Sequence, residues 1–218
     1  MDRARLADAC RTLPLFPLPG TVLMPGSLLP LHVFEPRYRA LVADCLRDAR
    51  PLSVCQIHPA EVSDAPNAPR VLPFAAVGII GGHHALPDGR FNVLVQPVGR
   101  VRIVAERATD HPYRVAEAQL LDDAEVDAGR MAVAGERVRG LFTPLVGRMG
   151  ENGARVAHAL AALPPERVPE ALSAVVIRGA DARQAFLAEP DPLRRAELVE
   201  GSILGLLAEM SGAVVAEA

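Results

Sequence analysis

The sequence predicts an α+β protein with a β-rich first half and a helical second half. Up to about residue 121, short apolar runs alternate with Pro and Gly, as they do in strands joined by turns. From residue 122 onward, Ala, Leu, Glu and Arg recur at helical spacing. We therefore expect two packed subdomains, a β-rich one over residues 1–121 and an α-helical one over residues 122–218.

The first expected strand, Leu13–Leu18, is unusually rich in proline. It contains Pro14 and Pro17, and Pro19 follows it. Because proline has no N–H to donate to a sheet, the sequence predicts a strand at a sheet edge or a bulge. A second strand is expected at Leu28–Phe34.

A helix is expected to begin at Pro36, because proline suits the first helical turn. Its apolar face follows at i, i+3, i+4 and i+7, from Tyr38 to Cys45. Asp88-Gly89 predicts a hairpin turn, and residues 59–69 an exposed flexible loop. Six or seven short strands with one helix indicate a small curled sheet or barrel. The further strands are expected at Leu52–Ile57, Val71–Gly82, Arg90–Pro97, Arg100–Arg107 and Tyr113–Leu121.

The second half predicts several helices with clear ends. Asp123 is a candidate cap for a helix that runs toward Met149. Asp191-Pro192, a cap residue followed by proline, opens the last helix. Shorter helices are expected at Ala154–Ala162, from Pro164 to Gly179 and from Asp181 to Ala188.

The basic residues exclude several classes of reaction. All 23 are Arg, and the chain has no Lys. P-loop ATPases, Schiff-base chemistry and Ser–Lys catalysis all need an amine that Arg cannot replace. The net charge of −3 gives no general basic field that would attract nucleic acid.

The sequence predicts a cytoplasmic protein without a membrane segment. The first residues carry charges where a secretory signal needs an apolar run, and no stretch is long and apolar enough to span a bilayer. Three cysteines without a C-x-x-C pair fit a reducing compartment better than a disulfide framework.

No catalytic motif, metal site or cofactor site emerges from the sequence. His83 and His84 are adjacent in a strand and so point to opposite faces, which argues against one shared metal ion. His32 is interpreted as an ordinary strand residue. A Cys55–His58 pair places its thiol in an apolar strand, where cysteine behaves as a small hydrophobe. Arg100 and Arg102 are expected to share the solvent face of a strand.

Two adjoining segments carry a long and specific pattern. Residues 13–26 read LPLFPLPGTVLMPG, and residues 29–38 read LPLHVFEPRY. Together they closely resemble the amino-terminal domain of Lon proteases. Residues 86–95 and 112–117 resemble later segments of the same domain. The resemblance implies a PUA-like β pseudo-barrel with one packed helix, followed by a C-terminal α-helical bundle. It also implies a stand-alone substrate-binding domain without ATPase and protease modules.

The same resemblance implies a non-enzymatic polypeptide-binding module in protein quality control. Its expected partners are unfolded or apolar polypeptide segments, and a separate protease is a further candidate partner. An open edge at Leu13–Leu18 is the expected surface. The peptide-binding candidates are Leu15, Phe16, Met24, Phe34 and Tyr38.

Two alternatives stay open. Met24, Phe34 and Tyr38 are also typical of core and helix packing. We expect Glu35, Pro36 and Arg37 to fix the strand-to-helix junction, with Phe34 and Tyr38 packed beneath it. At the level of function, the alternative is a PUA-like barrel that binds RNA or a nucleotide-like small molecule. The low aromatic content and the charge balance count against it.

Overall fold

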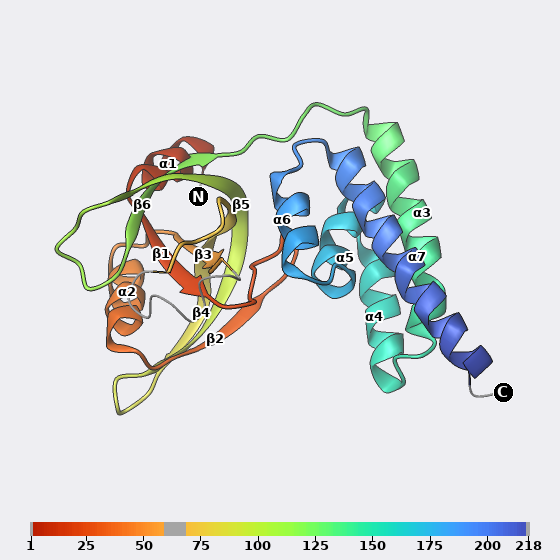
Figure 1. Ribbon diagram of the computed structural model, residues 1–218, viewed down its shortest axis with the longest axis horizontal. Coiled ribbons are helices and arrows are strands. Elements are labelled where there is room, and N and C mark those ends of the chain that lie inside the picture. Colours follow the sequence, from red (N-terminus) through yellow and green to blue (C-terminus); the bar gives the residue numbers. More distant parts are fainter. Residues whose placement is uncertain (1, 59–68, 217–218) are drawn as a thin grey trace. The chain divides into compact units, whose positions relative to one another are not determined.

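The computed structural model describes residues 2–58 and 69–216 (Figure 1). The loop expected at residues 59–69 lies, apart from Pro69, outside this range. Tertiary contacts divide the chain into two compact units. The β unit comprises Met1–Asp122 and Arg183–Ala188, and the helical unit comprises Asp123–Ala182 and Glu189–Ala218.

The β unit is built on a six-stranded mixed sheet with the order β2-β5-β4-β3-β1-β6. Among the strands that the structure describes, only the β1–β3 pair is parallel. The last part of the long strand β5 also pairs with β6, so the strands from β5 to β6 return on themselves. β2 pairs with the first part of β5 and stands outside this ring, so the sheet is not a regular barrel. The strands are β1 Leu13–Leu18, β2 Leu29–Val33, β3 Leu52–Gln56, β4 Phe74–Ala85, β5 Phe91–Arg107 and β6 Val115–Leu120.

The prediction that Leu13–Leu18 forms a sheet edge is wrong, because β1 lies between β3 and β6. The prolines fit this inner position since each lies where the strand has a partner on one side only. Pro14 precedes the register with β3, which begins at Leu15. Pro17 lies beyond the short register with β6, which covers Leu13 and Pro14. Neither proline therefore breaks a ladder hydrogen bond.

Apolar clusters bury both faces of the central strands. One cluster packs the helix α2 (Pro36–Arg47) against side chains such as Phe16 and Val54. The other packs α1 (Arg3–Ala9) and the 3-10 helix η1 (Cys10–Thr12) against side chains such as Leu15 and Cys55. Because successive strand residues point to opposite faces, this double coverage explains why all of β3 is buried.

A short segment from late in the sequence completes the β unit. Arg183–Ala188, in the helix α6 (Ala180–Ala188), clusters with the sheet. The Gln184 amide exchanges hydrogen bonds with the Phe74 backbone, and Arg100 donates to the Leu187 carbonyl at 2.6 Å. Arg100 is consequently buried, which corrects the expectation that it shares a solvent face with the exposed Arg102.

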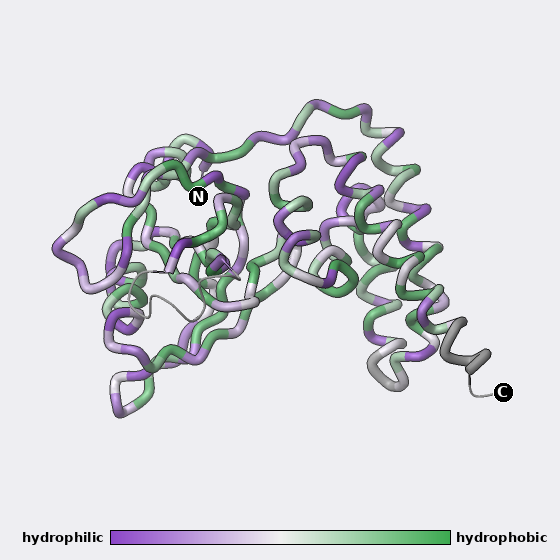
Figure 2. Tube along the Cα trace, viewed as in Figure 1, coloured by the Kyte–Doolittle hydropathy of each residue, from purple (hydrophilic) through white to green (hydrophobic). Residues whose placement is uncertain are grey.

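The helical unit is assembled around α3 (Ala128–Val146) and α7 (Pro192–Ala216). Apolar residues recur every three or four positions along α7, with hydrophilic ones between them (Figure 2). α4 (Glu151–Ala162), the 3-10 helix η3 (Pro165–Arg167) and α5 (Val168–Val176) also pack in this unit. Among the residues the structure describes, no helix is both long enough and apolar enough to cross a membrane.

The first helix of this unit begins later than expected. Its cap is Asp127, whose side chain accepts from the Arg130 N–H at 2.8 Å. Asp123 instead forms a bidentate pair with Arg195 of α7, at 2.9 and 2.7 Å. The buried Arg195 guanidinium also donates to Glu170 of α5 at 3.2 Å. An aspartate that reads as a helix cap thus serves as an ion-pair partner.

Candidate functional site

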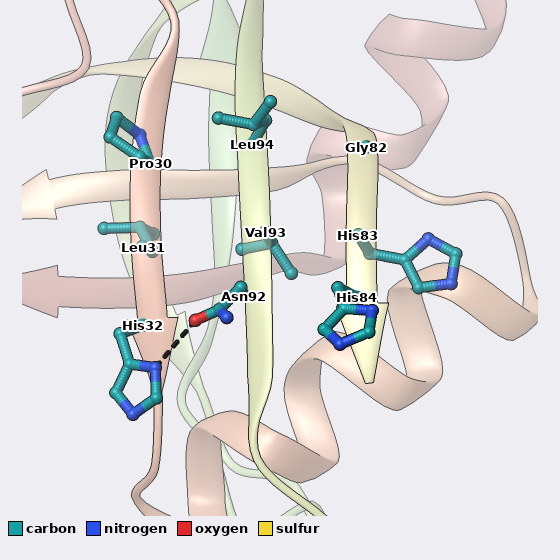
Figure 3. A pocket seen from close by; sticks show the side chains of 9 residues that line it. All are labelled: Pro30, Leu31, His32, Gly82, His83, His84, Asn92, Val93 and Leu94. Carbon is teal, nitrogen blue, oxygen red and sulfur yellow. Dashed lines mark hydrogen bonds between the residues drawn. The ribbon is translucent and has the colours of Figure 1, made fainter. Parts of the chain in front are cut away.

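The outer part of the sheet carries an open hollow of about 550 Å³. Figure 3 shows its residues on three neighbouring strands, β2, β5 and β4. We call it the sheet hollow. Its lining residues are Pro30, Leu31, His32, Gly82, His83, His84, Asn92, Val93 and Leu94.

Strand alternation places the exposed side chains of the sheet hollow. On β2, Pro30 and His32 are exposed, whereas Val33 is buried. On β5, Asn92 and Leu94 are exposed, whereas Val93 is buried. Because strand side chains alternate between faces, these exposed residues share one face of the sheet, and the buried ones belong to the core.

The strand register arranges this face into two cross-strand rows. Pro30 pairs with Leu94, which pairs with Gly82, so that one row is apolar. His32 pairs with Asn92, which pairs with His84, so that the next row is polar (Figure 3). A bulge between Ile80 and Gly82 sets the register of β4 here.

A chain of hydrogen bonds runs along one side of the polar row. The His32 Nδ1 lies 2.7 Å from Asn92 Oδ1, and its Nε2 lies 3.2 Å from an Arg90 guanidinium nitrogen. Arg90 also donates to Asp88 at 2.6 Å, in the turn between β4 and β5. The predicted hairpin turn is confirmed, and Gly89 supplies its positive φ of 79°.

Exposed apolar side chains flank the sheet hollow. Leu94 lies within it and is 43% exposed. Leu28 and Phe34, just before and just after β2, are 62% and 60% exposed. Leu28 and Phe34 lie at the two ends of β2, so they offer separate apolar contacts along the length of this strand.

Four of the five residues predicted to bind peptide lie in the core. Leu15, Phe16, Met24 and Tyr38 are all buried, and only Phe34 reaches the surface. Phe16 and Tyr38 stack on each other with centroids 4.1 Å apart. Met24 and Tyr38 therefore follow the alternative interpretation of the sequence, in which they pack in the core. Phe34 does not pack beneath the junction, because its side chain turns outward from the end of β2.

The junction between β2 and α2 contains a local ion pair. Arg37 donates to Glu35 Oε2 from Nε at 3.0 Å, and its guanidinium lies 4.7 Å from the Tyr38 ring centroid. The Glu35 carbonyl accepts the N–H groups of Tyr38 and Arg39, which begins the helix. Tyr38 donates its hydroxyl to the Pro17 carbonyl at 3.3 Å, and burial raises its pKa. These contacts tie the helix start to the sheet.

The pKa shifts of other titratable groups come from burial and from hydrogen bonds within the fold. Tyr113 donates to Asp44 at 2.7 Å, and this bond is the main cause that holds the pKa of Asp44 below its usual range. Burial raises the pKa of the Cys55 thiol to about 12, so it is no nucleophile near neutral pH. Over residues 2–58 and 69–216, no cluster of three or more His, Cys, Asp or Glu side chains could hold a metal ion.

Sequence reasoning missed that His32, His84 and Asn92 lie in one row. The Asp88-Gly89 turn could have predicted the pairing of His84 with Asn92, because a tight hairpin sets these two residues opposite each other. The pairing of β2 with β5 joins residues about 60 positions apart, and no local signal encodes it.

The comparisons with known proteins point to one family. A family model for the ATP-dependent protease La (LON) substrate-binding domain matches residues 12–203. Lon protease 2 of Myxococcus xanthus is 30% identical over 53% of this chain. Lon protease 1 of Herpetosiphon aurantiacus is 25% identical over 85% of it. These matches span only 14% and 20% of the two relatives' own lengths.

Solved structures agree with this relationship. A Lon N-terminal domain protein from Xanthomonas campestris is 28% identical, with a TM-score of 0.58 over 85% of this chain and 95% of that one. The N-terminal domain of the Mycobacterium avium complex Lon protease has a TM-score of 0.68 over 88% and 97% of the two chains. At 13% identity, the second likeness concerns the fold alone. With the family model covering most of its length, the chain belongs to the Lon substrate-binding domain family.

Proposed function

We propose that this protein is a non-enzymatic module that binds unfolded or apolar polypeptide segments. Membership of the Lon substrate-binding domain family supports substrate recognition as its general role. The observation that carries the proposal is the exposed face of β2 and β5, where Leu28, Phe34 and Leu94 present apolar surface beside the sheet hollow. Extended polypeptides commonly bind by adding a strand to an exposed sheet edge, and β2 is at one end of the strand order.

The proposed surface differs from the one expected at β1. Phe34 stays a proposed contact, joined by Leu28 and Leu94. β2 is suited to this role because, among the described strands, it pairs only with β5. The ion pair of Glu35 with Arg37, next to Pro36, is proposed to hold the end of β2 in place and so to fix the position of Phe34.

The finer assignments are part of the same proposal. We infer that the β unit is a PUA-like pseudo-barrel and that the helical bundle forms a second subdomain after residue 121. Tertiary contacts support this division, because they group the residues up to Asp122 in one unit. Arg183–Ala188 also belongs to that β unit. We further propose a cytoplasmic protein without a catalytic centre or cofactor, which presents bound segments to a separate protease.

Fluorescence anisotropy of a labelled, permanently unfolded polypeptide tests the proposed function. We expect binding that survives a change from 50 to 300 mM salt, because apolar contacts are screened little. Single-stranded RNA is the control, since phosphate contacts weaken steeply with salt. Binding of RNA alone would replace this proposal with the nucleic-acid alternative, and binding of neither probe would refute it.

A pair of variants on β5 then tests the location. Leu94→Ser removes an apolar side chain from the sheet hollow, and Val104→Ser removes one that is 55% exposed on the same strand but outside it. Burying a leucine contributes about 1.5–3 kcal/mol, so we expect Leu94→Ser to weaken polypeptide binding at least about fivefold. Val104→Ser should leave it unchanged. Equal effects of the two variants would place binding elsewhere.

A further inference from the structure

The charge pattern of the sheet hollow says more about the segments that it would accept. Among the described residues, those that line it include three histidines and an asparagine but no carboxylate. The neighbouring Asp88 is engaged by the Arg90 guanidinium at 2.6 Å and by the Arg90 N–H at 3.1 Å. No carboxylate therefore lies among the residues that line the polar row, and the charges of Arg90 and Asp88 beside it balance each other.

The hydrogen-bond chain fixes how the polar row presents its donors. Arginine can only donate, so the His32 Nε2 next to Arg90 must accept. The proton of the neutral ring then resides on Nδ1, which donates to Asn92 Oδ1. With its oxygen occupied, Asn92 offers its amide nitrogen as a donor, and no described side chain accepts from that nitrogen. Figure 3 shows Asn92 between His32 and His84, at the centre of the row.

The distance between the two rows matches an extended ligand. Leu94 and Asn92 are two residues apart on β5, which is about 6.6 Å along a strand. An extended polypeptide repeats side chains on one face with the same spacing. A ligand that places an apolar side chain against Leu94 and Pro30 therefore brings the side chain two positions away to the Asn92 amide.

We propose that the sheet hollow selects polypeptide segments with an apolar residue and an acidic residue two positions apart. This inference rests on the proposed function and names its substrate class. The apolar side chain packs on the Pro30–Leu94–Gly82 row, where the absence of a side chain at Gly82 leaves room. The carboxylate accepts from the Asn92 amide, and no carboxylate among the lining residues competes for that donor.

Matched peptides test this selectivity on the unaltered protein. Three labelled peptides share one apolar residue and differ two positions later, where they carry Glu, its uncharged isostere Gln, or Arg. We expect the Glu peptide to bind about five- to tenfold more tightly than the Gln peptide, and the Arg peptide to bind most weakly. If Glu and Gln peptides bind equally, the selectivity is refuted while the proposed function stands. If no peptide binds, whereas a longer unfolded polypeptide does, the sheet hollow is not the site.

A matched pair of variants assigns the effect to Asn92. Asn92→Asp replaces the donor with an anion of the same shape and should abolish the preference for Glu. Gln96→Glu adds the same charge on the same exposed side of β5 but outside the sheet hollow, and should preserve the preference. An equal loss in both variants would reduce the effect to net charge. Long-range ¹H–¹⁵N spectra of His32 check the network without any ligand. The Nδ1–H tautomer is expected, and the Nε2–H tautomer would overturn the assigned orientation of Asn92.

Discussion

Phe16 of β1 and Tyr38 of α2 stack with ring centroids 4.1 Å apart and an interplanar angle of 14°. Both rings are buried in the cluster between α2 and the sheet. The contact explains why the helix that follows β2 packs on this face. It also separates these two aromatic residues from Phe34, which precedes the same helix but lies at the surface.

Phe16→Ala and Phe34→Ala should differ sharply in stability. Phe16→Ala leaves a cavity beside Tyr38, so we expect the free energy of unfolding to fall by about 3–5 kcal/mol. Phe34→Ala should change it by no more than about 0.5 kcal/mol, as for other exposed sites, while weakening polypeptide binding. Urea denaturation measures both. A large loss of stability in Phe34→Ala would show that this ring packs in the folded protein.

Tyr113→Phe should destabilise the β unit in a pH-dependent manner. Its hydroxyl donates to Asp44, whose pKa is lowered in the folded protein. This stabilisation is complete above the unfolded carboxyl pKa of about 4 and is lost as the pH falls through the lower folded value. Near pH 7 we expect a loss of about 1.5–3 kcal/mol, which shrinks below pH 4.

Tyr38→Phe is the control for this titration. Tyr38 donates to the uncharged Pro17 carbonyl, so its effect on unfolding should not vary between pH 3 and pH 7. Chemical denaturation across this range compares the two variants. A Tyr113→Phe effect that stays constant with pH would contradict the role assigned to Asp44.

Arg195→Ala should be far more damaging than the same change at its neighbour Arg194. The Arg195 side chain is 2% exposed and pairs with Asp123 and Glu170. Because Asp123 and Glu170 are themselves 47% and 29% exposed, we expect the loss of these charged hydrogen bonds to cost about 1.5–3 kcal/mol. Arg194 is 66% exposed and pairs with Glu197 in solvent, so its loss should hardly change the free energy of unfolding. Similar unfolding midpoints for the two variants would argue against the ion-pair cluster as a support of the helical unit.

Replacing two glycines of α3 with alanine should change the stability of the helical unit in opposite directions. A Cβ at Gly135 would overlap the carbonyl oxygen of Pro165, so we expect Gly135→Ala to destabilise the helical unit by about 1–3 kcal/mol. A Cβ at Gly140 would meet nothing within 4 Å. Gly140→Ala should stabilise the helix by about 0.5–1 kcal/mol. Thermal unfolding of both proteins checks the prediction, and a tolerated Gly135→Ala would mean that η3 does not approach α3 so closely.

The three thiols should resist alkylation in the native protein. Burial raises the pKa of Cys10 to about 11 and that of Cys45 and Cys55 to about 12. At pH 8 almost no thiolate forms, and each sulfur is also inaccessible. We expect iodoacetamide to modify all three only after denaturation, as read by mass spectrometry. Rapid modification of a native thiol would show an opening of the core that the structure does not contain.

Local patterns predicted most of the secondary structure. Pro36 at a helix start, the Asp88-Gly89 turn and the Asp191-Pro192 cap are short-range signals, and the structure confirms each of them. Other features depended on distant partners. Asp123 reads as a helix cap in isolation, but Arg195, 72 residues away, engages it. Arg100 reads as a surface residue until Leu187 covers it.

The sequence by itself determined the two-part α+β organisation and the family, because apolar periodicity, turn residues and a long specific motif are all written locally. Only the tertiary structure decided which apolar residues are free to bind. β1 became an inner strand through pairing with both β3 and β6, which buried Leu15 and Phe16. β2 became the strand beside the sheet hollow, which exposed Phe34 and aligned His32, Asn92 and His84. The physical reason is that strand pairing joins residues far apart in sequence, and the alternation along a strand cannot say which neighbour it will have.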